Sequence, residues 1–344
     1  MDISERHSRH HAFPQVGIEG QRRLSAARIA VVGCGALGSR IVELLARAGV
    51  GRSDDGLLRI IDRDYVDLSN LQRQTLFVED DARSARPKAS AAVKHIGAID
   101  SAVRSEALVR ELNASTAMRL LEGMDLVLDG TDNFRARFVI NDAALASGIP
   151  WIYGAAIGSR GMMATIIPTV TPCLRCLMES APPIGAVESC DTAGIITPLP
   201  SVVAALQVAA AMKWIVSKKF DRGLLSFDLW QGPHGFRVLF EEVQPDPMCD
   251  SCGTGQLPAL DEDAEEVIAL CGRNSVQLMF GSEGDLDSAA RRMEGIAPVA
   301  RHAQSLTATI PEGRITLFAD GRIIVEGTTD TLQAKNTVAR YFGG

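Results

Sequence analysis

Short apolar runs alternate with amphipathic segments over most of this chain. The β-branched run at 28–32 precedes a glycine-rich turn, and residues 36–48 then carry apolar side chains at helical spacing. A second apolar run at 57–61 follows a turn at 52–56. A strand, a crossover helix and a second strand of these lengths predict a βαβ unit near the start of the chain.

The same alternation continues downstream. We expect helices at 88–99, 114–121, 135–147 and 201–216, and strands at 103–108, 125–129, 151–155, 162–167, 224–229 and 236–241. The last two strands are expected to form an antiparallel pair. The pattern as a whole predicts an α/β fold, a Rossmann-like open mixed sheet with helices on both faces.

A turn-rich segment at 245–258 and an acidic segment at 261–266 are typical of a linker. Beyond it we expect strands near 276–280, 306–310, 315–318 and 323–326 and helices near 285–293 and 331–341. The chain is therefore expected to have three parts: an N-terminal arm or helix at 1–25, a main domain at 26–253, and a small C-terminal α+β domain at 254–344.

Composition narrows the class of protein. Of 344 residues, 46% are hydrophobic and 22% are charged, which is typical of a globular protein with a sizeable core. The net charge of −7 argues against a nucleic-acid partner, which requires a broad basic face. The N-terminus lacks the apolar stretch of a signal peptide, and the longest apolar segment, 200–216, is interrupted by Gln207 and Lys213. We expect a cytoplasmic protein without a membrane span.

Glycines and acids at the ends of the predicted strands indicate a nucleotide site. Gly33, Gly35 and Gly38 form a turn between the first strand and its helix, and Asp62 ends the second strand. An acid in that position is placed to hold a ribose, and a glycine turn at a helix start can hold phosphates. A purely structural glycine turn is the alternative.

The segment after Asp62 and a later turn add polar candidates. Asp64, Ser69, Asn70, Gln72 and Arg73 follow the second strand, Lys88 begins a helix, Asp132 and Asn133 follow the strand at 125–129, and Arg9 lies in the arm. Arg9, Arg73 and Lys88 are candidate phosphate ligands, although single cations are more often surface charges. Asp132 is a candidate Mg²⁺ ligand. Alternatively, Asp132 or Asn133 caps the next helix.

The seven cysteines include two matched pairs. Cys173 and Cys176 form one CxxC pair, and Cys249 and Cys252 form the other, a pattern that predicts a closed structural Zn²⁺ site. Four unrelated thiols or one redox pair are the alternatives. Cys190 lies in a polar loop and is either a reactive thiol or a spectator, whereas Cys34 and Cys271 are expected to be packing residues.

Several of these motifs occur together in one family. The stretch from Asp62 through Leu68-Ser-Asn-Leu-Gln-Arg-Gln74, the Pro87-Lys88 helix start, Asp129-Gly-Thr-Asp-Asn133 and both CxxC pairs resemble the ubiquitin-activating-enzyme-like adenylyltransferases of the ThiF/MoeB/HesA type. The resemblance covers residues 5–253, and the C-terminal domain looks like an appendage found on some members. Ala36, where many members have glycine, and His10, where glutamine usually follows the arginine, depart from the family pattern.

This resemblance implies a reaction. The C-terminal Gly-Gly carboxylate of a small ubiquitin-fold sulfur-carrier protein attacks the α-phosphorus of ATP, giving an acyl-adenylate and pyrophosphate, and a thiocarboxylate is formed afterwards. Such enzymes serve thiamin, molybdopterin or related sulfur-transfer pathways, with a cysteine desulfurase or a rhodanese-type protein as a possible sulfur donor.

The family pattern also implies roles for single residues. It gives Asp62 the ribose, Asn70, Arg73 and Lys88 the phosphates, and Asp132 the Mg²⁺. It places Arg9 in the partner subunit's site, which implies a homodimer. Cys190 matches a loop cysteine that takes part in sulfur or thioester chemistry in some members.

Two other functions remain possible from the residues alone. An NAD-dependent oxidoreductase shares the glycine turn and Asp62, but it leaves Asn70, Arg73, Lys88 and Asp132 without a common role. A non-catalytic scaffold that binds a ubiquitin-like protein does not require phosphate and metal ligands.

Overall fold

The computed structural model describes residues 3–178, 180, 193–261, 267–270, 274–279, 284–301, 305–319 and 321–342. The chain divides into two compact units, Met1–Glu262 and Asp263–Gly344. The division falls after the position expected from the sequence, because residues just beyond the second CxxC pair still pack on the first unit. Ala259, for example, is buried, and its N–H donates to the Asp142 carboxylate at 2.9 Å.

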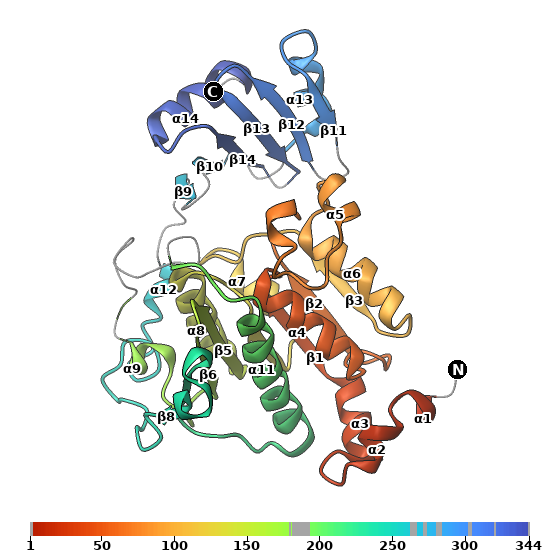
Figure 1. The fold of residues 1–344 in the computed structure, drawn as a ribbon. Helices are drawn as coiled ribbons and strands as arrows, with labels where there is room; N and C mark the ends of the chain where they lie inside the picture. Colours follow the sequence, from red (N-terminus) through yellow and green to blue (C-terminus); the bar gives the residue numbers. More distant parts are fainter. Residues whose placement is uncertain are drawn as a thin grey trace. The chain divides into compact units, whose positions relative to one another are not determined.

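The first unit is built on a mixed sheet of eight strands (Figure 1). In chain order these are β1 (Arg28–Val32), β2 (Leu57–Ile61), β3 (Ser105–Leu108), β4 (Leu126–Asp129), β5 (Trp151–Ile157), β6 (Arg160–Ile166), β7 (Leu224–Asp228) and β8 (Arg237–Leu239). Their spatial order is β3-β2-β1-β4-β5-β6-β7-β8, and the first five are parallel while the last three are antiparallel. The strand order reverses between β1 and β4, which is where open α/β sheets bind ligands.

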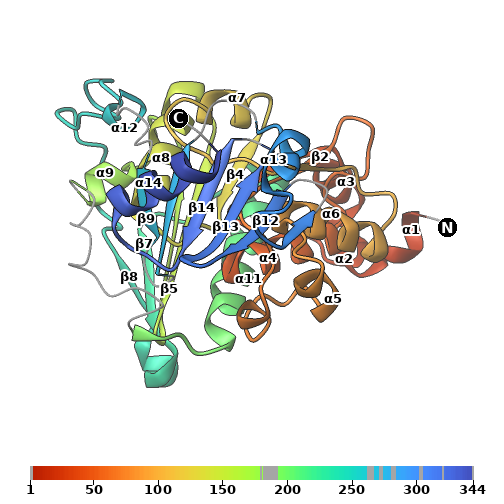
Figure 2. The same ribbon diagram turned by 90° about the horizontal axis from the view of Figure 1, so that it is seen from above.

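Helices cover both faces of this sheet, as the sequence predicts. Ile29 and Val31 of β1 pack into one apolar cluster with α4 (Ala36–Arg47), α6 (Lys88–Ile99) and α11 (Pro198–Ser217). Ala30 and Val32 point to the opposite cluster, formed with α7 (Ala117–Leu121) and α8 (Phe134–Ser147). Figure 2 shows α8 and α11 on opposite sides of the strands.

The apolar helix α11 is long and hydrophobic enough to cross a membrane by length and composition alone. It packs instead against α4, β5 and β6, and half of its most apolar window is buried. Gln207, the polar residue that interrupts its sequence, is fully buried and donates to the carbonyls of Asp129 and Ile152. These contacts are those of a core helix in a globular domain.

The remaining elements of the first unit are short. They are α1 (Ile3–Arg6), α2 (Ser8–Ala12), α3 (Gly17–Ala26), α5 (Glu79–Arg83), α9 (Leu174–Leu177), α12 (Pro258–Asp261) and the 3-10 turns η1 (Leu68–Asn70) and η2 (Leu229–Gly235). The helix expected at 114–121 begins only at Ala117, because Asn113 and Thr116 hydrogen-bond each other's backbone and hold a turn before it.

The second unit is a six-stranded antiparallel sheet with two helices. Its elements are β9 (Val267–Leu270), β10 (Ser275–Met279), α13 (Leu286–Met293), β11 (Val299–Arg301), β12 (Ser305–Ile310), β13 (Gly313–Phe318), β14 (Arg322–Glu326) and α14 (Thr331–Phe342). The strand order is β11-β12-β13-β14-β10-β9, and α13 and α14 close one apolar core with the sheet. This is the small α+β unit that the sequence predicts, with two further strands, β9 and β11, at its edges.

Candidate nucleotide site and metal centre

The glycine turn after β1 lies directly against the loop after β4. Gly33 has φ +82°, and a Cβ on Gly130 would lie 2.5 Å from the Gly33 carbonyl oxygen. A Cβ on Gly38 would lie 1.8 Å from that same oxygen, so only glycine allows α4 to start this close to the turn. A Cβ on Gly35, the N-cap of α4, would lie 3.9 Å from Gln74 Nε2, an ordinary van der Waals distance, and Ala36 begins the helix. The carboxyl ends of β1 and β4 therefore meet at a helix N-terminus suited to phosphate.

This close packing predicts that Gly38→Ala destabilises the protein by about 1–3 kcal/mol, the usual cost of overpacking. The added methyl group overlaps the backbone of Gly33, which cannot move without disturbing Gly130. The matched control is Gly97→Ala in α6, where nothing lies within 4 Å and alanine is the better helix former. Urea denaturation of both variants measures the difference, and equal stability of the two would contradict the packing argument.

Asp62 and Asp64 lie at the end of β2, beside this turn. The Asp62 carboxylate accepts the N–H groups of Cys34 at 2.5 Å and of Asp64 at 2.6 Å, so it braces the glycine turn. Burial raises the pKa of Asp62, while the nearby charge of Lys88 acts against that rise. Lys88 is 4% exposed, and its Nζ lies 3.1 Å from Asp64 Oδ2. A buried ammonium held beside two carboxylates is thus fixed at the edge of the site.

The polar segment that follows is organised by η1. Asp67 caps it, accepting both the N–H and the hydroxyl of Ser69, and the buried Asn70 completes a capping box. The half-buried Arg73 donates to the Ser69 carbonyl at 3.3 Å. Gln72 is exposed and accepts the Thr197 hydroxyl at 3.2 Å. The segment is a hydrogen-bonded turn that follows β2. Because β2 lies next to β1, this turn and the glycine turn follow neighbouring strands.

The loop 130–133 after β4 shows which of Asp132 and Asn133 caps the next helix. Asn133 is the N-cap of α8, and its side chain accepts the N–H of Ala136 at 2.9 Å. Asp132 is exposed and contacts the Asn133 amide at 3.3 Å. Because Asn133 provides the cap, the Asp132 carboxylate remains available for a ligand.

One predicted site residue, Arg9, is not brought to this edge. Arg9 lies exposed on α2, in an arm held by Arg6, which donates to the Ile99 carbonyl, and by Gln21, which donates to the Ala48 carbonyl. Those carbonyls end α6 and α4, so the arm lies at the amino edge of the parallel strands. Cys190 lies outside the described residues.

The cysteine thiols, in contrast, are brought together. The Sγ atoms of Cys173, Cys176, Cys249 and Cys252 all lie within 4.8 Å of one another. The pairs Cys173–Cys176, Cys173–Cys249 and Cys176–Cys252 are 3.8, 3.6 and 3.3 Å apart. Four sulfurs bound tetrahedrally to Zn²⁺ at about 2.3 Å would be about 3.8 Å apart, so the cluster fits zinc. Burial raises the pKa of Cys173 to about 12, so a thiolate there requires a cation beside it.

Two buried side chains of α8 tie this cluster to the domain. Asn141 accepts the N–H of Leu174, between the first two cysteines, at 2.8 Å. Asp142 accepts the Ala259 N–H and the Asn141 amide, both at 2.9 Å. Asn141 thus holds the first CxxC segment on α8, and Asp142 holds on the same helix Ala259 of α12, seven residues after the second CxxC segment.

Sequence reasoning missed several side chains near the site. Gln74 is 4% exposed, and its Nε2 is the atom that a Cβ on Gly35 would contact. Asp129 and Arg137 form a buried ion pair below the loop 130–133. Cys34, by contrast, was expected from the sequence to be a packing residue; it is fully buried, and burial raises its pKa well above the usual value. The buried pair could have been found only from the polar residue Arg137 within an otherwise apolar helical pattern.

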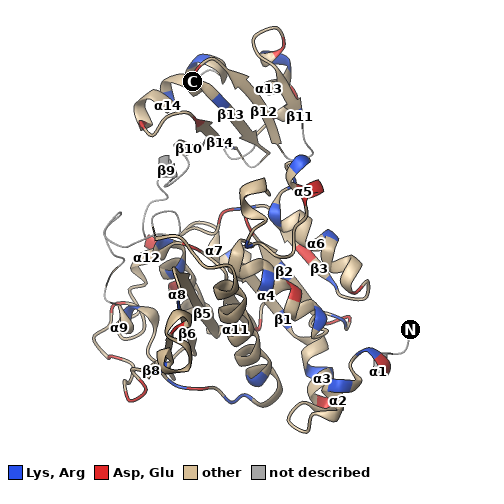
Figure 3. Cartoon of the chain, viewed as in Figure 1, with Lys and Arg blue, Asp and Glu red and all other residues tan. Residues whose placement is uncertain are grey.

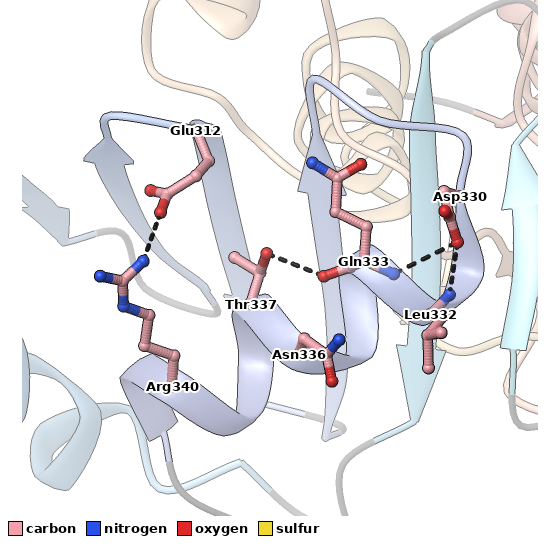
Figure 4. Close-up of a pocket in the computed structure, with 7 residues that line it drawn as sticks. All are labelled: Glu312, Asp330, Leu332, Gln333, Asn336, Thr337 and Arg340. Atoms are coloured by element: carbon pink, nitrogen blue, oxygen red, sulfur yellow. Dashed lines mark hydrogen bonds and ion pairs between the residues drawn. The ribbon is translucent and has the colours of Figure 1, made fainter.

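Two cavities in the second unit are lined by none of the predicted site residues. One, of about 370 Å³, lies along α14 beside the β12–β13 turn (Figure 4). Its charges are mostly satisfied within the unit, since Glu312 pairs with Arg340 at 2.7 Å and accepts the Tyr341 hydroxyl at 3.0 Å. A second, of about 550 Å³, lies beside Arg314 and Glu326, which also pair with each other. We assign neither a role in the nucleotide site.

Figure 3 shows acidic and basic residues interspersed along the elements of the first unit. A glycine turn at the switch point of a parallel sheet, an acid at the next strand end and a buried lysine are typical of the class of nucleotide-binding α/β domains.

Comparison with known proteins narrows this class. The ThiF family model matches residues 7–253, and the chain belongs to the ThiF family. It is 39% identical over 345 residues to the sulfur carrier protein ThiS adenylyltransferase of Bacillus subtilis, covering 99% of this chain and 100% of that protein. It is also 39% identical to a sulfur carrier protein adenylyltransferase of Thermus thermophilus, over 72% of this chain and 90% of that protein.

Solved structures show the same fold. E. coli MccB with ATP aligns with a TM-score of 0.61 at 21% identity, covering 72% of this chain and 74% of that one. The family and the fold expected from the sequence are thus confirmed. The Bacillus subtilis relative matches this chain over nearly its full length, whereas the Thermus thermophilus relative matches 72% of it.

Proposed function

We propose that this protein adenylylates the C-terminal Gly-Gly carboxylate of a small ubiquitin-fold sulfur-carrier protein, using ATP. The observation that carries the proposal is the nucleotide site just described, in a chain similar over its whole length to a ThiS adenylyltransferase. A carboxylate oxygen of the carrier attacks the α-phosphorus, the bond from that phosphorus to the bridging oxygen breaks, and pyrophosphate leaves. The product is an acyl-adenylate that a sulfur nucleophile can convert to a thiocarboxylate.

The described residues suit the demands of this step. Two anions must be aligned, and the negative charge that grows on pyrophosphate must be neutralised. Lys88, Arg73 and the N-terminus of α4 supply positive charge and N–H donors, and Asn70 supplies an amide. Asp62 holds the ribose hydroxyls, for which its oxygens keep lone pairs beyond those used by two backbone amides.

Asp132 is the residue that would hold Mg²⁺. Its exposed carboxylate suits this hard cation, which usually takes one or two protein carboxylates together with phosphate oxygens. Bound there, Mg²⁺ would supply charge neutralisation at the phosphates. The four clustered cysteines would hold Zn²⁺ in a closed structural site.

Assembly and cellular setting complete the proposal. The protein is a cytoplasmic homodimer in which Arg9 acts in the partner subunit's site, which accounts for the position of α2 at the far edge of its own sheet. The thiocarboxylate sulfur comes from a cysteine desulfurase or a rhodanese-type protein, and Cys190 is a candidate for its transfer.

The test is ATP–pyrophosphate exchange that depends on a Gly-Gly-ended carrier. Lys88→Ala is expected to lower the exchange rate about tenfold to a hundredfold, because a buried phosphate-binding cation is lost. Lys94→Ala, in the same helix but 53% exposed, is the matched control and is expected to keep full exchange.

The same assay separates the alternatives. A scaffold would give no exchange in the wild type and would keep its carrier affinity in Lys88→Ala. An oxidoreductase would bind a nicotinamide cofactor instead of supporting exchange. Either result would overturn the proposed function.

A further inference from the structure

A buried ion pair adjoins the loop 130–133, because it joins the residue before the loop to the helix after it. Asp129, at the end of β4, is 0% exposed, and Arg137, one turn into α8, is 6% exposed. Arg137 Nε lies 3.1 Å from Asp129 Oδ2. The other carboxylate oxygen, Oδ1, accepts the Thr131 N–H at 2.8 Å and the Thr131 hydroxyl at 2.6 Å.

Arg137 reaches the same loop from a second direction. Its Nη2 donates to the carbonyls of Thr131 at 3.0 Å and of Gly154 at 3.1 Å. The N–H, the hydroxyl and the carbonyl of Thr131 are therefore all held by this one ion pair. The rings of Phe134 and Tyr153 each lie 5.3 Å from the guanidinium carbon, so the guanidinium is also fixed by aromatic neighbours.

The neighbouring strand completes the frame. Gly154 of β5 donates its N–H to Asp129 Oδ2 at 3.4 Å, and Gln207 of α11 donates to the Asp129 carbonyl at 2.9 Å. Gly33 of the glycine turn lies against Gly130, the first residue of the loop. The loop 130–133 is thus in contact with the glycine turn through Gly130 and is held by the buried ion pair through Thr131.

Stability alone does not account for this arrangement. Removing two charges from water is costly, and replacing a buried ion pair by apolar residues is often neutral or stabilising. The pair instead fixes the conformation of the loop, because its hydrogen bonds converge on Thr131, the residue directly before Asp132. Ligands whose supporting hydrogen bonds are removed usually lose metal affinity or activity.

We propose that Arg137 is a positioning residue, which through Asp129 and Thr131 fixes the loop that presents Asp132 to the Mg²⁺ of the nucleotide. This inference rests on the proposed function, in which Asp132 holds that cation. Arg137 touches neither the nucleotide nor the carrier in this role. It sets where the Asp132 carboxylate is held.

The test variant is Arg137→Lys, which keeps a positive charge for Asp129 but lacks the fork that reaches two carbonyls. The matched control is Arg59→Lys in β2. Arg59 has the same kind of partners, the Glu106 carboxylate at 2.8 Å and the carbonyls of Leu120 and Glu122, but lies away from the loop.

Two readouts are expected to move in Arg137→Lys and not in Arg59→Lys. Hydrogen exchange of the Thr131 amide should be about tenfold faster, the equivalent of one hydrogen bond lost. The kcat for ATP–pyrophosphate exchange should fall about tenfold to a hundredfold, with a higher Mg²⁺ concentration for half-maximal rate and partial recovery at high Mg²⁺. The KM for ATP should change less than kcat, because the phosphate ligands are intact.

If Arg137→Lys does not fold, the double variant Asp129→Leu/Arg137→Met replaces it. This variant removes both charges and leaves no unpaired ion, and it is expected to be folded but to need more Mg²⁺. A folded variant with the Mg²⁺ requirement of the wild type, or Arg137→Lys with an unchanged Thr131 amide, would overturn the positioning role. Absence of exchange in the wild type would instead overturn the proposed function, while amide exchange would still test the loop.

Discussion

Asp132→Ala is expected to lower carrier-dependent ATP–pyrophosphate exchange on the order of a hundredfold or more, the typical cost of losing one electrostatic stabiliser. The reason is that this carboxylate is the proposed Mg²⁺ ligand where charge grows on the departing pyrophosphate. The fold should be unaffected, because Asp132 is exposed and the cap of α8 is provided by Asn133. Steady-state exchange together with a thermal melt measures both effects.

A surface carboxylate provides the control for this experiment. Asp221→Ala removes an exposed acid that pairs with Lys213 on the surface, and it should keep the wild-type rate. Wild-type exchange in Asp132→Ala would refute the assignment of this residue. A lower melting temperature with a proportional loss of rate would point to a structural role instead.

The central strands of the first unit could be predicted because they are mostly buried and therefore mostly apolar. In the runs 28–32 and 57–61 only Arg28, Leu57 and Arg59 are partly exposed, so hydrophobicity alone places these strands. Short edge elements lack this signal. The strand expected at 236–241 is only Arg237–Leu239 and is exposed, and β9 and β11, at the edges of the second sheet, were not predicted at all.

The candidate site could be predicted in part, for a similar reason. Residues at strand ends reach one sheet edge by topology, so Asp62, Asp64 and Asp132 could be grouped from the sequence. The choice between Asp132 and Asn133 as helix cap depends on side-chain orientation, which no spacing determines. The Asp129–Arg137 pair depends on a packing contact between a strand and the following helix. The pair matters for the loop because it holds the N–H, the hydroxyl and the carbonyl of Thr131, contacts that the sequence does not reveal.

For the metal centre, the sequence indicates the ligands but not the contacts that bring them together. CxxC spacing indicates a metal knuckle but does not show that two knuckles meet, since Cys173 and Cys249 are separated by 76 positions. In the structure the first segment is anchored on α8 through Asn141, and Arg175 of this segment donates to the Ser251 hydroxyl of the second segment at 3.0 Å. The cluster therefore closes a long loop that includes α11, β7 and β8.

We expect the purified protein to contain about one zinc per chain, and Cys249→Ser to lose that zinc together with most of the stability of the first unit. Structural zinc sites in small peptides contribute apparent free energies of about 10–16 kcal/mol. Without the cation, the buried thiol of Cys173 is neutral, because burial raises its pKa to about 12, and the four sulfurs no longer attract a common centre. Metal analysis and thermal melts, with and without a strong chelator, measure the loss.

Met248→Ala is the matched control, because Met248 adjoins Cys249 in the same turn, is 77% exposed and offers no thiolate. It should keep both the zinc and the melting temperature. Protein purified without chelator that contained no zinc would remove the metal assignment. Zinc loss without destabilisation would instead show that the metal does not stabilise the first unit. Because the cluster lies on the α8 face and not at the glycine turn, zinc loss should lower the exchange rate only as far as it lowers the folded fraction.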